Sequence, residues 1–337
     1  MSITLKEVAN ACGVSITTVS LVLNDRPNRI SEDVKARILE TVERLNYKPN
    51  PIAVSMITKK TNIWGLILPD ISNLYFSELA KVIEQNAYQS GYNIIYGNTT
   101  DSIEHTFEYF DFFYNRGVDG IIIIYSNKFN DEDKAKLNKL IQEADIPVII
   151  LDRFLAENRT TTILVDHRKG GYIATKHLLD LGHKVIGCIT GPKHIVSSNE
   201  RLLGYKDALK EAHIPFDESL IYHGDFQPHS GIKALESLLP KKVTAIFSFN
   251  DMMAIGFFRE CKKRKIRIPE DISVIGYDDI ILSELLDPPL TTITQPIDAL
   301  GKEAVLQMLE MMKKNDHNYK NIILNPSLKV RESTQKK

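Results

Sequence analysis

Charged, amide and aromatic side chains recur directly after the apolar runs in the second part of this 337-residue chain. Carboxylates, guanidinium groups and amides bind hydroxyl groups, and aromatic rings stack on the faces of sugars. We therefore predict a binding site for a small polyhydroxylated molecule. Its predicted lining residues are Asn73, Tyr75, Phe76, Asp152, Arg153, Arg201, Phe226, Asn250, Asp278 and Gln295.

Several residues of this set also have a purely structural interpretation. Asp152 and Arg153 can form a salt bridge across a hinge, whereas Tyr75 and Phe226 can belong to a core. Taken together at consecutive strand ends, the ten residues favour a ligand site, because polar groups that converge in one pocket are typical of binding sites.

Four further residues near the predicted site are expected to have structural roles. Asp251 is expected to cap the helix that follows it, and Asp279 either to cap a short helix or to lie in a structural turn. His167 and His183 are expected at helix ends or on the surface, and nothing in the sequence indicates a metal near them. We predict no metal and no cofactor.

The elements that position the ten residues alternate between strands and helices. The predicted strands are 64–70, 92–98, 119–125, 147–152, 184–191, a run near Leu220, 244–250, 272–278 and 291–294. The predicted helices lie near 75–90, 104–116, 131–143, 168–181, 199–212, 230–238 and 251–263. The alternation occurs twice, which predicts two doubly wound α/β lobes with parallel sheets. Ligands of such sheets bind outside the carboxyl ends of the strands, so the two lobes predict a cleft between them.

The first 24 residues have a different pattern, that of two short helices joined at Gly13. Glycine tolerates the positive φ of a tight turn, and Ser15 can cap the second helix. This pattern predicts a helix-turn-helix, whose second helix enters the major groove of DNA. The expected inner face comprises Val14, Val19, Val22 and Leu23, and the expected outer face comprises Ile16, Thr17, Thr18 and Leu21.

A third helix is predicted after Ser31, with Ser31 as its capping residue. Its apolar stripe comprises Val34, Ile38, Val42 and Leu45. The segment 47–51 is expected to end this helix, because residues before proline disfavour the α conformation. The short segment that follows is expected to be either a linker or a helix that folds on DNA, with Ala53 against its twin and Met56 as a minor-groove wedge.

Bulk composition excludes few classes of protein. The net charge is −1, but nine basic and six acidic residues lie among the first 60, which leaves −4 for the remainder. This modest asymmetry fits a DNA-binding head on an acidic body. The three cysteines are far apart and suggest buried, reduced thiols in a cytoplasmic protein. We expect no secretory leader and no membrane-spanning segment.

An enzyme is not predicted. The sequence has neither a G-x-x-x-x-G-K-[ST] phosphate loop nor a G-x-G-x-x-G motif at a strand–helix turn, and no nucleophile elbow. The adjacent acids Asp278 and Asp279 are expected to point apart on an extended segment. The other alternative is a secreted solute-binding protein. Such a protein would need export and would lack a DNA-binding head, so the sequence argues against it.

Many ordered segments carry a resemblance to a known family. They include TLKEVANACGVSITTVSLVLN, RISEDVKARILETVERLNYKPN, LILPDISNLYFSEL, VDHRKGGYIATKHLLDLGHKVIGCITGP, TAIFSFNDMMAIG, RIPEDISVIGYDDI and PPLTTITQP. Over nearly its whole length the chain resembles the LacI/GalR family of bacterial transcription regulators. The resemblance implies an all-α helix-turn-helix head joined to a two-lobe α/β core like that of periplasmic sugar-binding proteins. The implied domains are 1–48 for the head, 49–61 for a hinge helix, 62–161 with 292–320 for the first lobe, and 162–291 with 321–334 for the second.

For the head, the resemblance implies a homodimer that binds a near-palindromic double-stranded operator. The implied DNA contacts are Thr4, Ser15, Ile16, Thr17, Thr18, Ser20, Leu21, Asn24, Arg26, Tyr47, Asn50, Ala53 and Met56. The sequence departs from many members at Leu21, which cannot make the bidentate contacts that identify guanine. Met56 replaces the usual wedge leucine and Val54 a usual arginine, so we expect an unusual operator preference.

For the core, the resemblance implies a small effector in the cleft, and the predicted lining residues match those of ribose-binding relatives. We expect a repressor of a sugar-utilisation operon that is induced by a pentose such as ribose. The aromatic pair Tyr75 and Phe76 also resembles that of the purine repressor. A purine or another corepressor therefore stays open as the effector, as does a catabolite-control regulator with a protein partner.

Overall fold

The structure is a computed structural model, and it describes residues 3–23, 29–48, 55, 58, 60–155, 160–313 and 319–337. The chain divides into two compact units, Met1–Thr61 and Asn62–Lys337. The predicted DNA contacts Asn24, Arg26, Asn50, Ala53 and Met56 lie outside the described residues, as does most of the predicted hinge helix.

The first unit is a three-helix head, with α1 (Leu5–Cys12), α2 (Ile16–Leu23) and α3 (Glu32–Arg44). Its core consists of the buried Val8, Ala9, Cys12, Val19 and Ile38, with Val14, Val22, Leu23, Val34, Val42, Leu45 and Tyr47 packed against them. The apolar faces predicted for the second and third helices are therefore confirmed.

Caps set the boundaries of the head helices. Thr4 and Glu7 form a reciprocal capping box at the start of α1, and Gly13 ends it with φ 64°. Ser15 Oγ accepts from the backbone N–H of Thr18 at 3.0 Å, as predicted. Ser31 lies at the expected position before α3, but its hydroxyl makes no capping hydrogen bond, so the prediction of a hydroxyl cap is wrong there.

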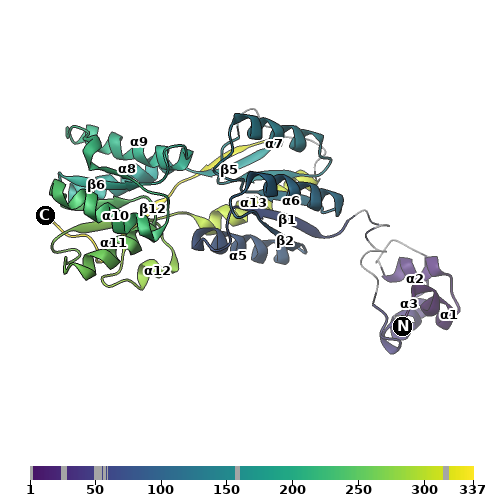
Figure 1. Cartoon of the computed structure of the whole chain (residues 1–337). Coiled ribbons are helices and arrows are strands. Elements are labelled where there is room, and N and C mark those ends of the chain that lie inside the picture. Colours follow the sequence, from purple (N-terminus) through teal and green to yellow (C-terminus); the bar gives the residue numbers. More distant parts are fainter. Residues whose placement is uncertain are drawn as a thin grey trace. The chain divides into compact units, whose positions relative to one another are not determined.

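The second unit contains two lobes, each built on a six-stranded sheet (Figure 1). The first sheet has the order β11-β5-β4-β3-β1-β2, and all five of its pairings are parallel. Its strands are β1 (Ile63–Leu68), β2 (Asn93–Asn98), β3 (Gly120–Ile123), β4 (Val148–Leu151), β5 (Thr161–Val165) and β11 (Asn321–Leu324). Its helices are α5 (Leu74–Gln89), α6 (Ile103–Asn115), α7 (Asp131–Glu143) and α13 (Ile297–Lys313). Separate apolar clusters form under α5 with α13 and under α6 with α7, so helices cover both faces.

The second sheet has the order β12-β10-β9-β8-β6-β7 and is parallel except for the pairing of β12 with β10. Its strands are β6 (Ile186–Thr190), β7 (Ile221–His223), β8 (Ala245–Ser248), β9 (Ser273–Asp278), β10 (Thr291–Thr294) and β12 (Ser327–Lys329). Its helices are α8 (His167–Asp180), α9 (Val196–Glu211), α10 (Pro228–Leu238), α11 (Asp251–Lys263) and the short α12 (Ile281–Glu284). The predicted fold class, two doubly wound lobes behind a helical head, is confirmed.

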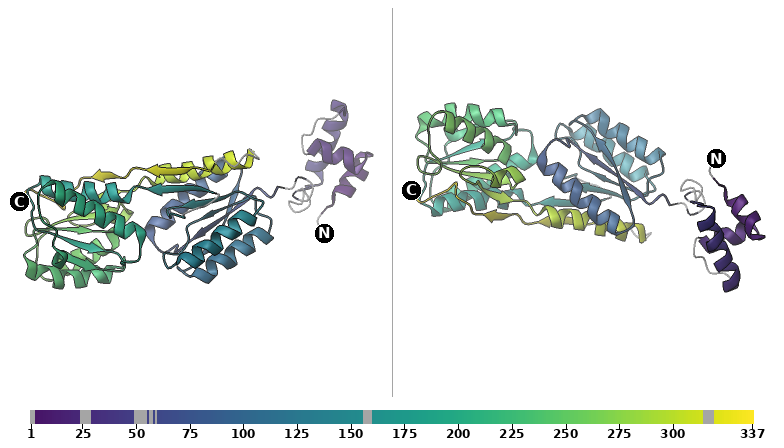
Figure 2. Two further views of the ribbon diagram at one scale, coloured as in Figure 1. Left: turned by 90° about the horizontal axis from the view of Figure 1, so that it is seen from above. Right: turned by 90° about the horizontal axis from the view of Figure 1, so that it is seen from below.

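The chain crosses between the lobes three times, and the crossings differ from the predicted boundaries. They fall between β5 and α8, between β10 and α13, and between β11 and β12. Figure 2 shows the yellow C-terminal segment running along the first lobe and back to the second. The predicted boundaries at 161/162, 291/292 and 320/321 are wrong, because they assign β5 and β11 to the second sheet and β10 to the first.

Cys12, Cys188 and Cys261 are free and buried, as predicted from their spacing. In the parts of the chain that the structure describes, no helix is both long and apolar enough to cross a membrane.

Candidate effector site between the lobes

The ten predicted residues meet in one cavity between the two lobes. Its lining contains all of them, together with Asn127 and Ser197. The residues of the first lobe follow β1, β3 and β4, and those of the second follow β6, β7, β8, β9 and β10. Strand ends of two parallel sheets therefore face each other, which is the arrangement that open α/β sheets use for ligands.

Two acid–arginine pairs face each other in this cavity. Arg153 pairs with Asp152 from the first lobe, and Arg201 Nη2 lies 3.9 Å from Asp278 Oδ1 in the second. Gln295 Nε2 donates to Asp278 at 2.7 Å. Tyr75 Oη donates to Asp152 at 3.0 Å. With both carboxyl groups ionised, the pairs leave the site rich in hydrogen-bonding groups and close to electrical neutrality.

Some polar atoms of the site are buried without a partner. Arg153 Nε, Arg201 Nε and Gln295 Oε1 have no hydrogen-bond partner within the described structure. Arg201 and Gln295 as whole residues are only 4% and 3% exposed. Buried polar groups are nearly always satisfied in native proteins, so orphaned atoms that line a cavity indicate a missing ligand or water.

The backbone of the site is also strained. Asp152 has φ 58°, Phe226 φ 67° and Asp278 φ 111°, and residues other than glycine rarely adopt such values. Each such residue costs about 1–3 kcal/mol and persists where the surrounding structure enforces it. Three of the ten lining residues therefore carry a strained backbone.

Burial shifts the acid–base properties of the second lobe's carboxylates. The full burial of Asp278 raises its pKa to about 8, although Arg201 and the bond from Gln295 act in the opposite direction. Burial likewise raises the pKa of Asp251 to about 6. Asp278 is thus the carboxyl group of the cavity whose charge changes near neutral pH.

The residues flanking the site correct several sequence-based expectations. Asn250, not Asp251, caps α11, by accepting from the N–H of Met253. Asp251 is fully buried and accepts hydrogen bonds from Ile280, Ser283 and Thr292. Together these bonds tie α11 to α12 and β10. Asp251 is therefore a structural linker outside the cavity.

Asp279 and Asp278 contact different partners, although both have a positive φ and so do not lie on the extended segment that was expected. Asp279 pairs with Arg331 at 2.6 Å and with Lys329 at 3.5 Å. It accepts a hydrogen bond from Thr294 and therefore fixes the junction with β12.

The predicted positions of the two histidines are only partly correct. His183 follows α8 but is buried, between the hydroxyl of Thr244 and the carbonyl of Gln335. His167 begins α8 but is not on the surface, because its ring lies between Asp152, Arg201 and Tyr277. Among the described residues, no group of histidine, cysteine or acid side chains is arranged to hold a metal ion.

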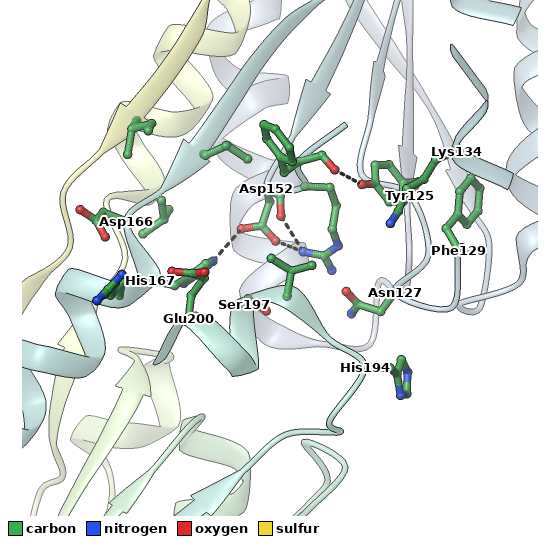
Figure 3. A pocket seen from close by; sticks show the side chains of 17 residues that line it. Tyr125, Asn127, Phe129, Lys134, Asp152, Asp166, His167, His194, Ser197 and Glu200 are labelled. Carbon is green, nitrogen blue, oxygen red and sulfur yellow. Dashed lines mark hydrogen bonds and ion pairs between the residues drawn. The ribbon is translucent and has the colours of Figure 1, made fainter. Parts of the chain in front are cut away.

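A larger cavity of about 420 Å³ adjoins the site and shares Asn127, Asp152, Arg153 and Ser197 with it. Figure 3 shows Asp152 at its centre, with His167 on one side and Tyr125 on the other. The cavity that contains all ten predicted residues is much smaller, about 70 Å³. Ligand pockets measure about 300–1,000 Å³, so the larger cavity lies within that range and the smaller one below it.

Gly191 lets the ring of Phe226 approach the end of β6. A Cβ atom at Gly191 would lie 2.1 Å from Phe226 Cζ. Overpacking of this kind costs about 1–3 kcal/mol. We expect Gly191→Ala to displace the ring and to weaken effector binding about tenfold, measured by calorimetric titration. Gly91→Asn, which replaces a glycine with open space around it, is the control, and equal affinities in both variants would contradict this role of Phe226.

The predicted DNA contacts that the structure describes lie on the head. Ile16 is 46% exposed and Thr17 is exposed at the start of α2, whereas Leu21 is half-buried. The hydroxyls of Thr4, Ser15 and Thr18 take part in helix caps. Ser20 lies half-buried in α2, and Tyr47 packs against the core of the head.

Comparison with known proteins agrees with this architecture. Residues 4–50 match the model of bacterial regulatory proteins of the lacI family, and residues 175–334 match a periplasmic binding protein-like domain. The chain is 36% identical over 335 residues to the HTH-type transcriptional repressor PurR of Vibrio vulnificus (strain CMCP6), with 99% of both proteins covered. It is 37% identical to the repressor of the same name from Vibrio atlanticus (strain LGP32), over 99% of this chain and 98% of that protein.

Solved structures give the same result. The structure resembles the lac repressor dimer bound to operator and the anti-inducer ONPF, with a TM-score of 0.88 and 28% identity over 99% of this chain and 100% of that one. It also resembles a LacI family transcriptional regulator from Enterococcus faecium with bound ribose, with a TM-score of 0.73 and 31% identity over 82% of this chain and 99% of that one.

These relatives share one activity. LacI-family repressors are cytoplasmic transcriptional regulators, not enzymes, and they bind operator DNA as dimers under the control of small-molecule effectors. The match spans both units of this chain, from the head to the two-lobe core. The chain therefore belongs to the LacI family of bacterial regulatory proteins and is a ligand-responsive, DNA-binding transcriptional repressor.

Proposed function

We propose that the effector is a free pentose, with ribose as the first candidate, and that it induces a sugar-utilisation operon by releasing the repressor. The observation that carries this proposal is the set of buried, unpartnered polar atoms of Arg153, Arg201 and Gln295 around one small cavity. Sugar hydroxyls both donate and accept, so a single pentose can satisfy guanidinium donors and an amide oxygen together.

With Asp278 ionised, the charges of the cavity favour a neutral ligand over a phosphorylated one. Arg153 and Arg201 are each paired with an acid, Asp152 and Asp278. A phosphate group would need a cation that is not already compensated. The aromatic side chains Tyr75 and Phe76, in edge-to-face contact, supply an apolar wall against which a sugar ring can pack.

The relatives support two candidates. The Enterococcus faecium regulator with bound ribose supports a pentose. The PurR repressors, with 36–37% identity over nearly the full length, support a purine that acts as corepressor. Calorimetric titration with ribose, other pentoses, hexoses, hypoxanthine and guanine separates the candidates. Binding of a purine with failure of all the sugars would refute the pentose proposal.

On the DNA side, we propose that the start of α2 reads base edges. The exposed Ile16 and Thr17 are suited to contact with thymine methyl groups and with single acceptors. Among the described residues, the proposed contacts are Thr4, Ser15, Ile16, Thr17, Thr18, Ser20, Leu21 and Tyr47. The set implied by the family also contains residues outside the described ranges, namely Asn24, Arg26, Asn50, Ala53 and Met56.

The proposed switch is a shift between two arrangements of the lobes. A ligand changes that equilibrium only as far as it binds one arrangement more tightly than the other. The paired acids and arginines lie on both lobes, so a bound pentose that bridges them favours closure. We propose that closure lowers operator affinity, which makes the pentose an inducer.

The effector affinity should depend on pH because of Asp278, whose pKa burial raises to about 8. In the ligand-free protein, protonation of Asp278 stabilises the fold. This contribution to the free energy of unfolding is fully present below about pH 4 and is lost as the pH rises through about 8. A hydroxyl that donates to Asp278 favours the ionised carboxylate. Ribose affinity should therefore rise by up to about tenfold per unit from about pH 6 to 8 and then level off. Titrations at several pH values measure this, and the same slope in Asp278→Asn would contradict the assignment.

A further inference from the structure

The ring of His167 lies at the first crossing between the lobes, beside the effector site. It begins α8 directly after Asp166, whose N–H donates to Leu324 of the first lobe's sheet. The His167 side chain is only 10% exposed. A histidine so deeply buried at a hinge has its orientation fixed by its neighbours.

The hydrogen bonds of His167 define one tautomer. Arg201 Nη2, which is only a donor, lies 3.3 Å from Nδ1, and Tyr277 Oη lies 3.0 Å from the same atom. Nδ1 must therefore accept, and the proton of the neutral ring lies on Nε2. The guanidinium of Arg201 also stacks 3.6 Å from the centre of the Tyr277 ring, so the three side chains form one packed group.

The Nε2 side of the ring faces the first lobe. Nε2 lies 4.0 Å from Oδ1 of Asp152 (Figure 3). The same oxygen accepts a hydrogen bond from Tyr75. The distance from Nε2 to Oδ1 is longer than a hydrogen bond, and an approach of about 1 Å would make it one. His167 thus contacts Arg201, a proposed effector-binding residue of the second lobe. It also lies opposite Asp152, a proposed effector-binding residue of the first lobe.

We propose that His167 is a positioning residue that holds Arg201 in place and links it to Asp152 when the lobes close. This role rests on the proposed effector site. It adds to that proposal, because the affinity for the effector then depends on a side chain that the effector does not touch. The neutral Nε2–H tautomer is essential to this role. A ring with the proton on Nδ1 would repel the Arg201 donor and present a lone pair to the carboxylate.

The test compares His167→Ala with His167→Gln, because glutamine can accept from Arg201 through its oxygen and donate toward Asp152 through its amide. We expect alanine to weaken ribose binding 10- to 100-fold, and glutamine to restore it to within about fivefold of the unmodified protein. His213→Asn, at an exposed histidine, is the matched control. Unchanged ribose affinity in the alanine variant would overturn the proposal. Equal losses of ribose affinity in the alanine and glutamine variants, together with equal losses of thermal stability, would indicate a merely structural role and would also overturn the proposal.

A second measurement keeps this proposal separate from that of the ligand. If the unmodified protein binds neither ribose nor another pentose, the proposed function fails, but the tautomer of His167 can still be measured in the ligand-free full-length chain. ¹⁵N NMR of the histidine side chains, with the His167 signal assigned by its loss in His167→Gln, should give a neutral Nε2–H ring. The groups that face it are Asp152, Arg153, Arg201 and Tyr277. An Nδ1–H tautomer, or a ring that becomes protonated as readily as a free histidine, would overturn the positioning role.

Discussion

Arg201→Ala is expected to weaken effector binding by at least about 100-fold while operator binding persists in the absence of ligand. Arg201 faces the cavity with an unpartnered Nε, and its other nitrogens contact His167 and the carbonyl of Phe249. The loss of two hydrogen bonds from a charged group costs about 3 kcal/mol, at roughly 1.5 kcal/mol each, which is more than 100-fold in affinity. Calorimetry measures the effector affinity, and fluorescence anisotropy measures the operator affinity.

Two further variants exclude a simple loss of folding. Arg201→Lys keeps the positive charge beside Asp278 but lacks the Nε–H, and we expect it to lose most of the effector affinity as well. Arg267→Ala removes an exposed arginine that pairs with Asp271 at the surface. Exposed ion pairs contribute about 0–1 kcal/mol, so this control should bind effector normally. An Arg201→Ala protein that responds at ordinary effector concentrations would refute the assignment of the cavity.

Ile38→Asn is expected to abolish operator binding and to leave effector binding unchanged within about twofold. Ile38 is fully buried in the core of the head, and an amide there has no partner. Cavity formation and an unsatisfied polar group together cost about 3–5 kcal/mol, as much as a domain of this size has in total. The effector site should survive because it belongs to a separate compact unit.

The neighbouring residue offers the matched control. Leu39 is 51% exposed, so Leu39→Asn introduces the same amide, without a change of charge, at the surface of the same helix. It should retain operator binding and the helical circular-dichroism signal of the head. If Ile38→Asn bound operator normally, or if it lost effector binding together with operator binding, the division into a DNA-binding head and an independent effector core would be wrong.

The sequence predicted the composition of the cavity well because one topological rule determines it. Asn73 and Asp152 each follow a strand of a parallel sheet and Asp278 is the last residue of one, and such strands end at the same edge. The same rule applied to the run that ends at Tyr125 would also have found Asn127. Ser197 lies in the first turn of α9, some distance beyond its strand, where the sequence has no comparable signal.

The crossings and the hinge residue were harder to predict. β5, β11 and β12 are short, and their assignment to a lobe depends on hydrogen bonds to strands far away in the sequence. His167 is buried because of the crossing after β5. It is the first residue of α8, where the chain enters the second lobe, so its ring lies between the two lobes. The positive φ values of Asp152, Phe226 and Asp278 also depend on tertiary contacts, which local residue preferences do not encode.

The central claim is that a pentose in the cleft controls operator binding. The most direct measurement is the affinity of the full-length protein for DNA from the upstream region of its own operon, by anisotropy at fixed salt, with and without saturating ribose, hypoxanthine or guanine. Fixed salt is essential because protein–DNA affinity falls steeply as salt rises. We predict that ribose weakens operator binding at least tenfold and that neither purine changes it. Tighter operator binding with a purine, and no effect of ribose, would contradict the account.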